Sequence, residues 1–207
     1  MYENILFEKK DGVAYLTLNR PDRLNALNSA VLKELDEALA EIDGDAEIRI
    51  LVVKGAGEKA LAAGADITEM QSMEAEAGMA FGAFGQKVFA KIEALRQPSI
   101  AMIPGFALGG GCELALACDI RIASEKARFG QPEVGLGITA GFGGTQRLPR
   151  LVGRGAASLL LFSGKMIDAA EALRIGLVDK IVPHDALAAD ALAQLRQAGT
   201  YGIVGKT

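Results

Sequence analysis

Two glutamates lie in apolar, glycine-rich surroundings that suit a solvated carboxylate poorly. Glu113 lies between Cys112 and Leu114, and Glu133 follows Pro132. An ionised carboxylate without partners is costly in an apolar environment. Such surroundings can also tune the pKa values of two carboxyl groups so that the pair acts as general acid and general base. The structural alternatives are that Glu113 only caps a helix and that Glu133 is a solvated loop residue.

Three glycine-dense segments could bring the backbone close to a ligand: residues 62–67, 105–113 and 130–144. Glycine allows such an approach and lets backbone N–H groups point at the ligand. The middle segment follows a buried apolar stretch, so Gly109-Gly110-Gly111 is predicted to open a helix with Glu113 in its first turn. The free N–H donors of a helix start can stabilise a developing oxyanion. A tight turn whose glycines serve only packing is the alternative.

Other reactive groupings have little support in the sequence. The single histidine, His184, follows Pro183 and is predicted to be a surface or capping residue rather than a catalytic base. No histidines and cysteines cluster at the spacing of metal ligands, so no metal site is expected. Glycine-rich phosphate loops of the Walker or dinucleotide type are absent as well, because Gly205-Lys206-Thr207 has no helix after it.

The elements that must position these residues alternate between strands and helices. Period-two and apolar patterns predict strands at residues 13–18, 48–53, 99–103, 119–123 and 180–182. Apolar residues at intervals of three and four predict helices at residues 27–44, 74–95, 154–162, 169–175 and 187–195. The first helix should be capped by Asn28 and ended by Gly44. This order of elements predicts an α/β fold with largely parallel strands.

Length and composition favour one domain. The chain has 207 residues, of which 50% are hydrophobic, enough for a core without disulfides or metals. We expect a single domain over residues 1–198 and a loose tail over residues 199–207, which hold three glycines and no periodicity. Cys112 and Cys118 lie six residues apart in an apolar stretch, which suits buried thiols in a reducing compartment better than a bridge.

Charge and the apolar runs argue against two classes of partner. The formal net charge of -4 provides no excess of basic residues for a phosphate backbone, so nucleic acid is not an expected partner. Residues 99–117 approach membrane length, but Pro104, four glycines and Glu113 interrupt them. The first ten residues do not resemble a signal peptide. The sequence therefore predicts a cytoplasmic location and no membrane contact.

Three separated motifs resemble the crotonase, or enoyl-CoA hydratase, family. They are AAGADITEM at 62–70, GFALGGGCELALACDIRIAS at 105–124, and FGQPEVGLGI followed by GFGGTQRL over 129–148. The resemblance runs from the first strand to about His184 and is closest to the short-chain hydratases. It implies a crotonase-like spiral of ββα units with mostly parallel strands. It also implies reversible addition of water to a short-chain trans-2-enoyl-CoA, which gives a 3-hydroxyacyl-CoA.

The resemblance assigns roles to particular residues. The thioester carbonyl would lie between the N–H groups of Ala65 and Gly110, which form an oxyanion hole. Glu133 would exchange the proton at Cα, and Glu113 would orient and deprotonate the water that attacks Cβ. No cofactor is implied, because coenzyme A is part of the substrate. An enoyl-CoA isomerase, another acyl-CoA lyase of this fold, or a non-catalytic acyl-CoA-binding or assembly subunit are the alternatives.

The resemblance also extends to the rest of the substrate and to assembly. Arg23 and Leu24 would contact the nucleotide end of CoA, and Ala63, Asp66 and Ile67 would line the adenine and pantetheine groove. A homotrimer or a dimer of trimers is implied. One departure concerns the C-terminus: family members usually continue with a further helical segment that helps cover the ligand and build the trimer, and residues 199–207 do not resemble it.

Overall fold

The computed structural model describes residues 2–191 and 193, whose strands form two sheets. The large sheet contains, in spatial order, β1 (Ile5–Lys10), β2 (Val13–Leu18), β3 (Ile50–Gly55), β5 (Ser99–Ile103), β7 (Ile120–Ser124) and β10 (Lys180–Val182). The small sheet contains β4 (Ala60–Ala62), β6 (Phe106–Leu108), β8 (Arg128–Gly130) and β9 (Ile167–Asp168). Strand β1 is antiparallel to β2 and β9 to β8, whereas the other neighbouring strands are parallel. The predicted α/β class with mostly parallel strands is confirmed.

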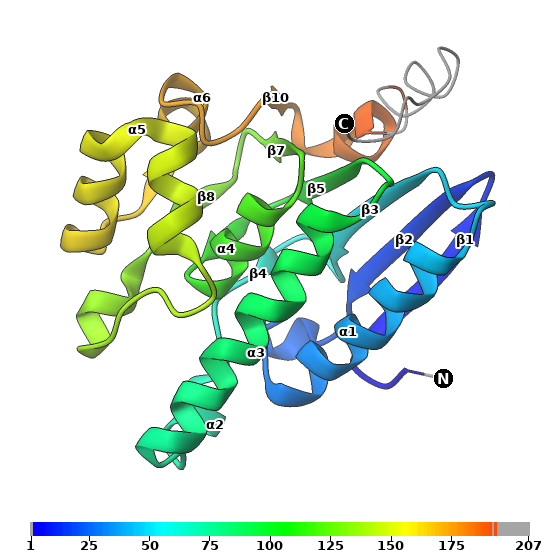
Figure 1. Ribbon diagram of the computed structural model, residues 1–207. Coiled ribbons are helices and arrows are strands. Elements are labelled where there is room, and N and C mark those ends of the chain that lie inside the picture. The colour runs from blue at the N-terminus through cyan, green and yellow to red at the C-terminus, as the bar shows by residue number, and fades with distance from the viewer. Residues whose placement is uncertain (1, 192, 194–207) are drawn as a thin grey trace.

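Helices cover the sheets and link them. They are α1 (Ser29–Gly44), α2 (Ile67–Met70), α3 (Ala75–Ala94), α4 (Gly110–Ala117), α5 (Gly144–Ser163) and α6 (Ala169–Arg174). Figure 1 shows α1 and α3 side by side across one face of the large sheet. Within the described part of the chain, no helix is both long and apolar enough to cross a membrane.

Three successive units of the chain repeat one arrangement. In each unit the first strand joins the large sheet, the second joins the small sheet, and the chain then enters helical structure. The units begin with β3-β4, β5-β6 and β7-β8. This succession is the expected spiral of ββα units, and it places the ends of β4, β6 and β8 next to one another.

Helix α1 forms where its periodicity predicts. The Asn28 side chain accepts a hydrogen bond from the Val31 N–H at 2.9 Å, and Gly44 is the last helical residue. Such a cap satisfies one of the backbone donors that a helix start leaves unpaired. The apolar face at Leu35 and Leu39 is buried against the large sheet. The predicted bounds of this helix are therefore confirmed within two residues.

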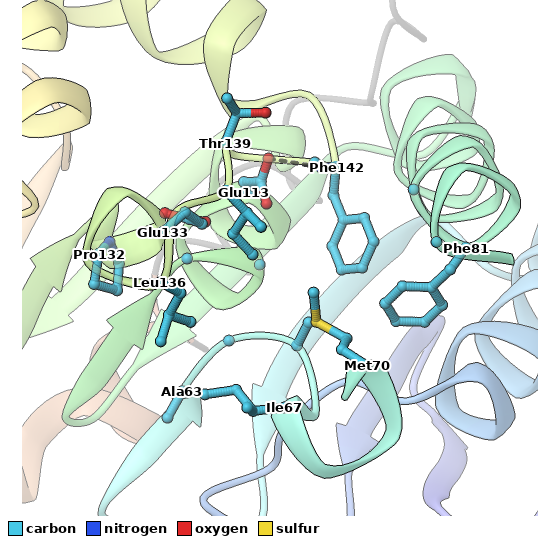
Figure 2. A pocket seen from close by; sticks show the side chains of 18 residues that line it. Ala63, Ile67, Met70, Phe81, Glu113, Pro132, Glu133, Leu136, Thr139 and Phe142 are labelled. Atoms are coloured by element: carbon cyan, nitrogen blue, oxygen red, sulfur yellow. Dashed lines mark hydrogen bonds between the residues drawn. The ribbon is translucent and has the colours of Figure 1, made fainter. Parts of the chain in front are cut away.

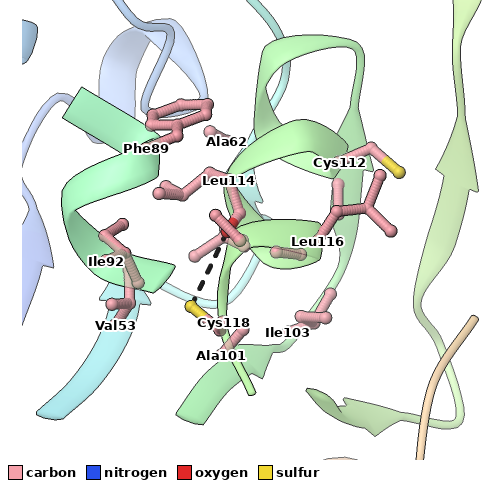
Figure 3. Close-up of a cluster of buried hydrophobic side chains, with 14 of the residues drawn as sticks. Val53, Ala62, Phe89, Ile92, Ala101, Ile103, Cys112, Leu114, Leu116 and Cys118 are labelled. Atoms are coloured by element: carbon pink, nitrogen blue, oxygen red, sulfur yellow. Dashed lines mark hydrogen bonds between the residues drawn. The ribbon is translucent and has the colours of Figure 1, made fainter. Parts of the chain in front are cut away.

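The central strands of the large sheet are buried on both faces, as parallel strands usually are. In β3, Leu51 and Val53 belong to the core beneath α1 and α3, whereas Ile50 and Val52 belong to a second cluster on the opposite face. This alternation follows from the two-residue period of a strand. Figure 3 shows the first core, in which Phe89 of α3 packs near side chains of α4, β3 and β5.

Both cysteines lie in this interior as thiols, with no disulfide between them. Cys112 and Cys118 are buried, and the Cys118 Sγ donates to the Leu114 carbonyl oxygen at 3.6 Å (Figure 3). Burial raises the pKa of the Cys112 thiol to about 12. The prediction of two buried thiols rather than a bridge is confirmed.

Some elements differ from those expected. Strand β1 was not predicted, because it is an edge strand whose only fully buried residue is Ile5 and whose end is charged. Helix α5 begins at Gly144, ten residues earlier than expected, and contains Pro149 and a non-helical Gly153 at φ 79°. Proline and glycine inside the segment masked its periodicity. The predicted tail at 199–207 and the end of the helix predicted at 187–195 lie outside the described residues.

Candidate active site

The site lies where three parallel strands of the small sheet end. Strand β4 leads into Ala65, β6 leads into Gly110 and Glu113, and β8 leads into Glu133. Because β4, β6 and β8 are parallel neighbours, their carboxyl ends lie at the same edge of the sheet. Open parallel sheets bind ligands at this edge. The three glycine-dense segments of the sequence therefore meet here.

A cavity of about 300 Å³ occupies this edge. Its lining combines both predicted acids, both predicted oxyanion residues and an apolar wall. Figure 2 shows Glu113 and Glu133 on one side, with Met70 of α2 and Phe81 of α3 across from them. Such a hollow, mostly apolar with a few converging polar groups, is the usual form of a small-molecule site.

Glu113 is held inside the protein by backbone donors. It lies in the first turn of α4 and is 1% exposed. Its Oε1 accepts hydrogen bonds from the N–H groups of Phe142 at 2.8 Å and Gly144 at 2.6 Å. Burial raises the pKa of Glu113 to about 7, since removal from water outweighs these two hydrogen bonds, and the nearby charge of Glu133 acts in the same direction.

Glu133 lies on a short 3-10 helix, Pro132–Leu136, that follows β8 directly. It is half-buried, and burial raises the pKa of its carboxyl group. Gln131, itself 1% exposed, points its amide at this carboxylate. In the orientation that satisfies both ends of the amide, the Gln131 nitrogen donates to Glu133 Oε1 at 3.0 Å and Oε2 at 3.2 Å. Gly109 lies against the same carboxylate, where a Cβ would approach Oε1 to 2.9 Å.

The two residues predicted to form the oxyanion hole are Ala65 and Gly110. Gly110 is the first residue of α4, so its N–H has no partner within the helix. Around Ala65, the Leu27 N–H donates to the Gly64 carbonyl at 2.9 Å and the Asp66 N–H donates to the Leu27 carbonyl at 2.8 Å. These bonds flank Ala65 on one side, and its own N–H therefore points to the other side. Both residues line the cavity.

The residues expected along the CoA groove divide into two sets. Ala63 and Ile67 line the cavity, and Ile67 is half exposed. Leu24 lines a separate groove of about 210 Å³, and its carbonyl accepts from the Ala63 N–H at 3.0 Å, which joins the two regions. Arg23 is exposed beside this groove.

Asp66 does not turn its side chain to the cavity. It forms an ion pair with Arg20 at 2.8 Å and accepts a hydrogen bond from the Thr68 N–H at 3.1 Å, as the cap of α2. The Arg20 guanidinium holds the pKa of this carboxyl group below its ordinary value. Its geometry is that of a structural residue at the rim of the site.

His184 lies apart from the cavity. Its Nδ1 is 3.0 Å from the Ser124 Oγ, and its Nε2 is 3.5 Å from the Glu58 carboxylate. It opens the 3-10 helix His184–Ala186 and is not among the residues that line the cavity. Among the described residues, no three or more His, Cys, Asp or Glu side chains are grouped for a metal ion.

Sequence reasoning missed the groups that hold the two acids. Gln131 was quoted only as part of a motif, and the N–H donors of Phe142 and Gly144 reach Glu113 across 29 and 31 residues of chain. The one signal available was the density of glycine between 141 and 144, because the Gly144 Cα carries no side chain where the carboxylate approaches.

Comparison with known proteins agrees with this geometry. Residues 8–200 match the profile of a family described as enoyl-CoA hydratase/isomerase. Over 179 residues, 86% of this chain and 69% of its relative, the sequence is 59% identical to a short-chain-enoyl-CoA hydratase of Clostridium acetobutylicum. Over 186 residues, 90% of this chain and 72% of its relative, it is 55% identical to a crotonyl-CoA hydratase of Syntrophomonas wolfei.

The three-dimensional likeness is equally close. The crystal structure of an enoyl-CoA hydratase from Bacillus anthracis superposes with a TM-score of 0.92 at 42% identity, covering 95% of this chain and 77% of that chain. The resemblance noted in the three sequence motifs is thereby confirmed, and so is the crotonase-like fold. The chain belongs to the enoyl-CoA hydratase/isomerase family.

Proposed function

We propose that this protein is an enoyl-CoA hydratase, which adds water reversibly to a short-chain trans-2-enoyl-CoA and gives the 3-hydroxyacyl-CoA. One observation carries the proposal. Two glutamates with raised pKa values, Glu113 and Glu133, line one cavity together with Ala65 and Gly110, whose N–H groups are proposed to hold the thioester oxygen. The names of the relatives from Clostridium acetobutylicum and Syntrophomonas wolfei support the same reaction and a short acyl chain.

The two N–H groups serve the carbonyl oxygen of the thioester. Addition of a nucleophile at Cβ moves negative charge onto this oxygen, as an enolate forms. Donors that are fixed in advance stabilise that charge without reorganisation, and in other enzymes the loss of one such donor raises the barrier by about 3–4 kcal/mol. The start of α4 at Gly110 adds the partial positive charge of a helix N-terminus.

The two glutamates divide the proton transfers. Ionised Glu113 takes a proton from water, and the resulting hydroxide equivalent forms the C–O bond at Cβ. Protonated Glu133 then delivers its proton to Cα: the electron pair of the enolate double bond forms the Cα–H bond, and the C=O double bond of the thioester re-forms. A pKa of about 7 leaves part of Glu113 ionised near neutral pH, as a base requires. Burial raises the pKa of Glu133 and so favours the protonated form that an acid requires. No cofactor is required, because coenzyme A belongs to the substrate.

The direct test uses crotonyl-CoA and the purified protein. We expect the absorbance of the enoyl-thioester to fall, and mass spectrometry to identify 3-hydroxybutyryl-CoA. A shifted double bond without added water would instead identify an isomerase. Binding of crotonyl-CoA with no turnover, by protein shown to be folded, would identify an acyl-CoA-binding subunit.

In this proposal the remainder of the substrate extends from the cavity toward the separate groove at Leu24. Ala63 and Ile67 contact the pantetheine from the cavity wall, and Arg23 and Leu24 approach the nucleotide end. Asp66 acts through its cap and its ion pair with Arg20, which fix the segment that carries Ala65. Removal of the Arg23 charge by Arg23→Gln should raise KM for crotonyl-CoA and leave kcat unchanged.

Assembly as a homotrimer or a dimer of trimers forms part of the proposal. The second half of α5 exposes large apolar side chains, including Phe162, which is 78% exposed, and Leu159, which is 64% exposed, and Met166 follows nearby. Exposed apolar groups of this size in one region favour burial against a partner. Light scattering should give the mass of three or six chains, and a monomer would contradict assembly. The two buried thiols, which form no disulfide, suit a reducing compartment such as the cytoplasm.

A further inference from the structure

A largely buried arginine lies behind the cavity wall, on the side away from the substrate. Arg147 of α5 donates from Nη1 to the Phe142 carbonyl at 2.7 Å and from Nη2 to the Glu93 carboxylate at 2.6 Å. The N–H of Phe142, on the preceding peptide, is one of the two donors to Glu113. The Arg147 guanidinium therefore binds the same loop whose N–H groups bind Glu113.

Two glycines of this loop leave room for a cation, Arg147, and an anion, Glu113, to contact its backbone. At Gly143, with φ +105°, a Cβ would lie 2.2 Å from Arg147 Nη1, so a side chain there would exclude the guanidinium. At Gly144, a Cβ would lie 3.0 Å from Glu113 Oε1. The adjacent glycines thus leave room for Arg147 and Glu113 to contact the same stretch of backbone.

Helix α3 also contacts this loop and its arginine. Gln86 donates from Nε2 to the Gly141 carbonyl at 2.8 Å, and Glu93 of the same helix forms the ion pair with Arg147. The side chain of Arg147 is only 13% exposed, whereas that of Glu93 is 47% exposed. A planar guanidinium with two fixed partners restricts the loop more than a flexible ammonium would.

We propose that Arg147 and Glu93 form a positioning pair for Glu113, in which the pair fixes the Phe142–Gly144 loop and so aims the carboxylate at the attacking water. This inference rests on the proposed hydratase function. It adds Arg147 as a residue that acts on the reaction through Glu113. Neither Arg147 nor Glu93 lines the cavity, so neither touches the substrate. Two N–H donors on Oε1 leave Oε2 of Glu113 for the water.

The pair also adjusts the charge of Glu113. Two charged groups act on this carboxylate: Glu133 from the 3-10 helix after β8, which raises its pKa, and Arg147 from α5, which lowers it, while burial raises it most. Glu93 of α3 pairs with Arg147 and so offsets part of the guanidinium charge. Loss of the guanidinium charge should therefore raise the pKa of Glu113, and loss of the Glu93 charge should lower it.

Kinetics of Arg147→Gln provide the main test. We expect kcat for crotonyl-CoA to fall up to about 100-fold, because small misplacement of a catalytic group has effects of that size. KM should stay within about twofold, and the acid limb of the pH profile should move to higher pH. Arg147→Lys keeps the charge but cannot reproduce both bonds, so its acid limb should stay in place while kcat recovers in part.

Two further variants separate positioning from general damage. Glu93→Gln should move the acid limb to lower pH, opposite to Arg147→Gln. Arg150→Gln is the matched control on the same helix, because Arg150 donates only to Gln146 among the described contacts and should leave kcat and the acid limb as in the wild type. If Arg147→Gln does not fold, Arg147→Lys and Glu93→Gln decide the inference.

Amide hydrogen exchange tests the pair without any turnover. The N–H groups of Phe142 and Gly144 should exchange faster in Arg147→Gln than in the wild type or Arg150→Gln. Unchanged exchange and an unmoved acid limb in folded Arg147→Gln would overturn the inference. A wild-type protein without hydratase turnover would overturn the proposed function instead, and the exchange rates would still decide whether Arg147 fixes the loop.

Discussion

Glu113 and Glu133 face the same cavity from two different kinds of local structure. Glu113 lies on a regular helix, is 1% exposed and is held by N–H groups that come 29 and 31 residues later in the chain. Glu133 lies on a short 3-10 helix, is half-buried and receives its amide partner, Gln131, from two residues earlier. One acid depends on the tertiary fold, and the other depends mainly on its own turn.

This difference suits the two proposed tasks. A base that must aim one oxygen at a water benefits from distant, rigid donors, since these restrict its orientation. An acid that gives up and regains a proton at Cα benefits from partial exposure and a local, adjustable amide. Because Glu113 is more deeply buried, its ionised form costs more desolvation free energy in the folded protein than that of Glu133.

The largest expected effect comes from removing either carboxyl group. Glu133→Gln and Glu113→Gln should each lower kcat by about 10²–10⁴-fold, because an uncharged amide can neither accept nor deliver the proton. Turnover of crotonyl-CoA, measured on variants with wild-type circular dichroism, checks this. Wild-type rates in Glu133→Gln would remove that residue from the mechanism and would end the comparison between the two acids.

The second effect should distinguish the acids by stability. Because the folded pKa of Glu113 is raised from 4.5 to about 7, its stabilising protonated form is fully present below pH 4.5 and is lost as pH rises through 7. Glu113→Gln removes this loss. At pH 8 the free energy of unfolding of the variant should therefore be about 3 kcal/mol higher than that of the wild type. Urea denaturation at pH 8 and pH 4.5 measures it, and the gain should vanish at the lower pH.

For the same measurement, Glu133→Gln is the internal control. Its carboxyl group is more exposed, so the gain in unfolding free energy at pH 8 should be smaller than for Glu113→Gln. Equal gains in the two variants would show that the two carboxylates are desolvated to the same extent, contrary to the burial described above.

The sequence predicted the helix that carries Glu113 but not the sheet that assembles the site. Gly109-Gly110-Gly111 after an apolar run was enough to place Glu113 in the first turn of α4, because helix starts have local signals. Strands β4, β6 and β8 have three residues each, too few for a period, and they form only because neighbouring segments pair with them. Family resemblance, rather than pattern, indicated that the three segments meet.

The residues that position the two acids could not be predicted from the sequence for a related reason. Arg147 lies in a segment whose helical periodicity is obscured by Pro149 and Gly153, so its side-chain direction could not be predicted. Gln131 precedes a proline and carries no local pattern that indicates burial. Contacts that join residues 93, 113, 142 and 147 exist only after α3, α4 and α5 have packed together.

The pH dependence of the wild type should report the more buried acid. If ionised Glu113 is the base, kcat/KM for crotonyl-CoA should fall about tenfold for each pH unit below 7, so that about 1% of the activity remains at pH 5. A Glu133 base would have to be ionised instead, and Glu113→Gln would then keep the acid limb. If the acid limb persists in Glu113→Gln, Glu133 would be the base and Glu113 the acid.

The smallest effect concerns the space beside Glu113. In Gly144→Ala the added Cβ would lie 2.9 Å from the side-chain amide of Gln131 and 3.0 Å from Glu113 Oε1, so the carboxylate or the loop must shift by a few tenths of an ångström. We expect kcat to fall roughly tenfold, since the shorter of the two N–H bonds to Glu113 comes from this residue. Gly155→Ala, on the same helix with open space at its Cβ position, is the control and should leave kcat unchanged. A normal rate in Gly144→Ala would mean that Glu113 tolerates displacement and that its distant donors do not set its orientation.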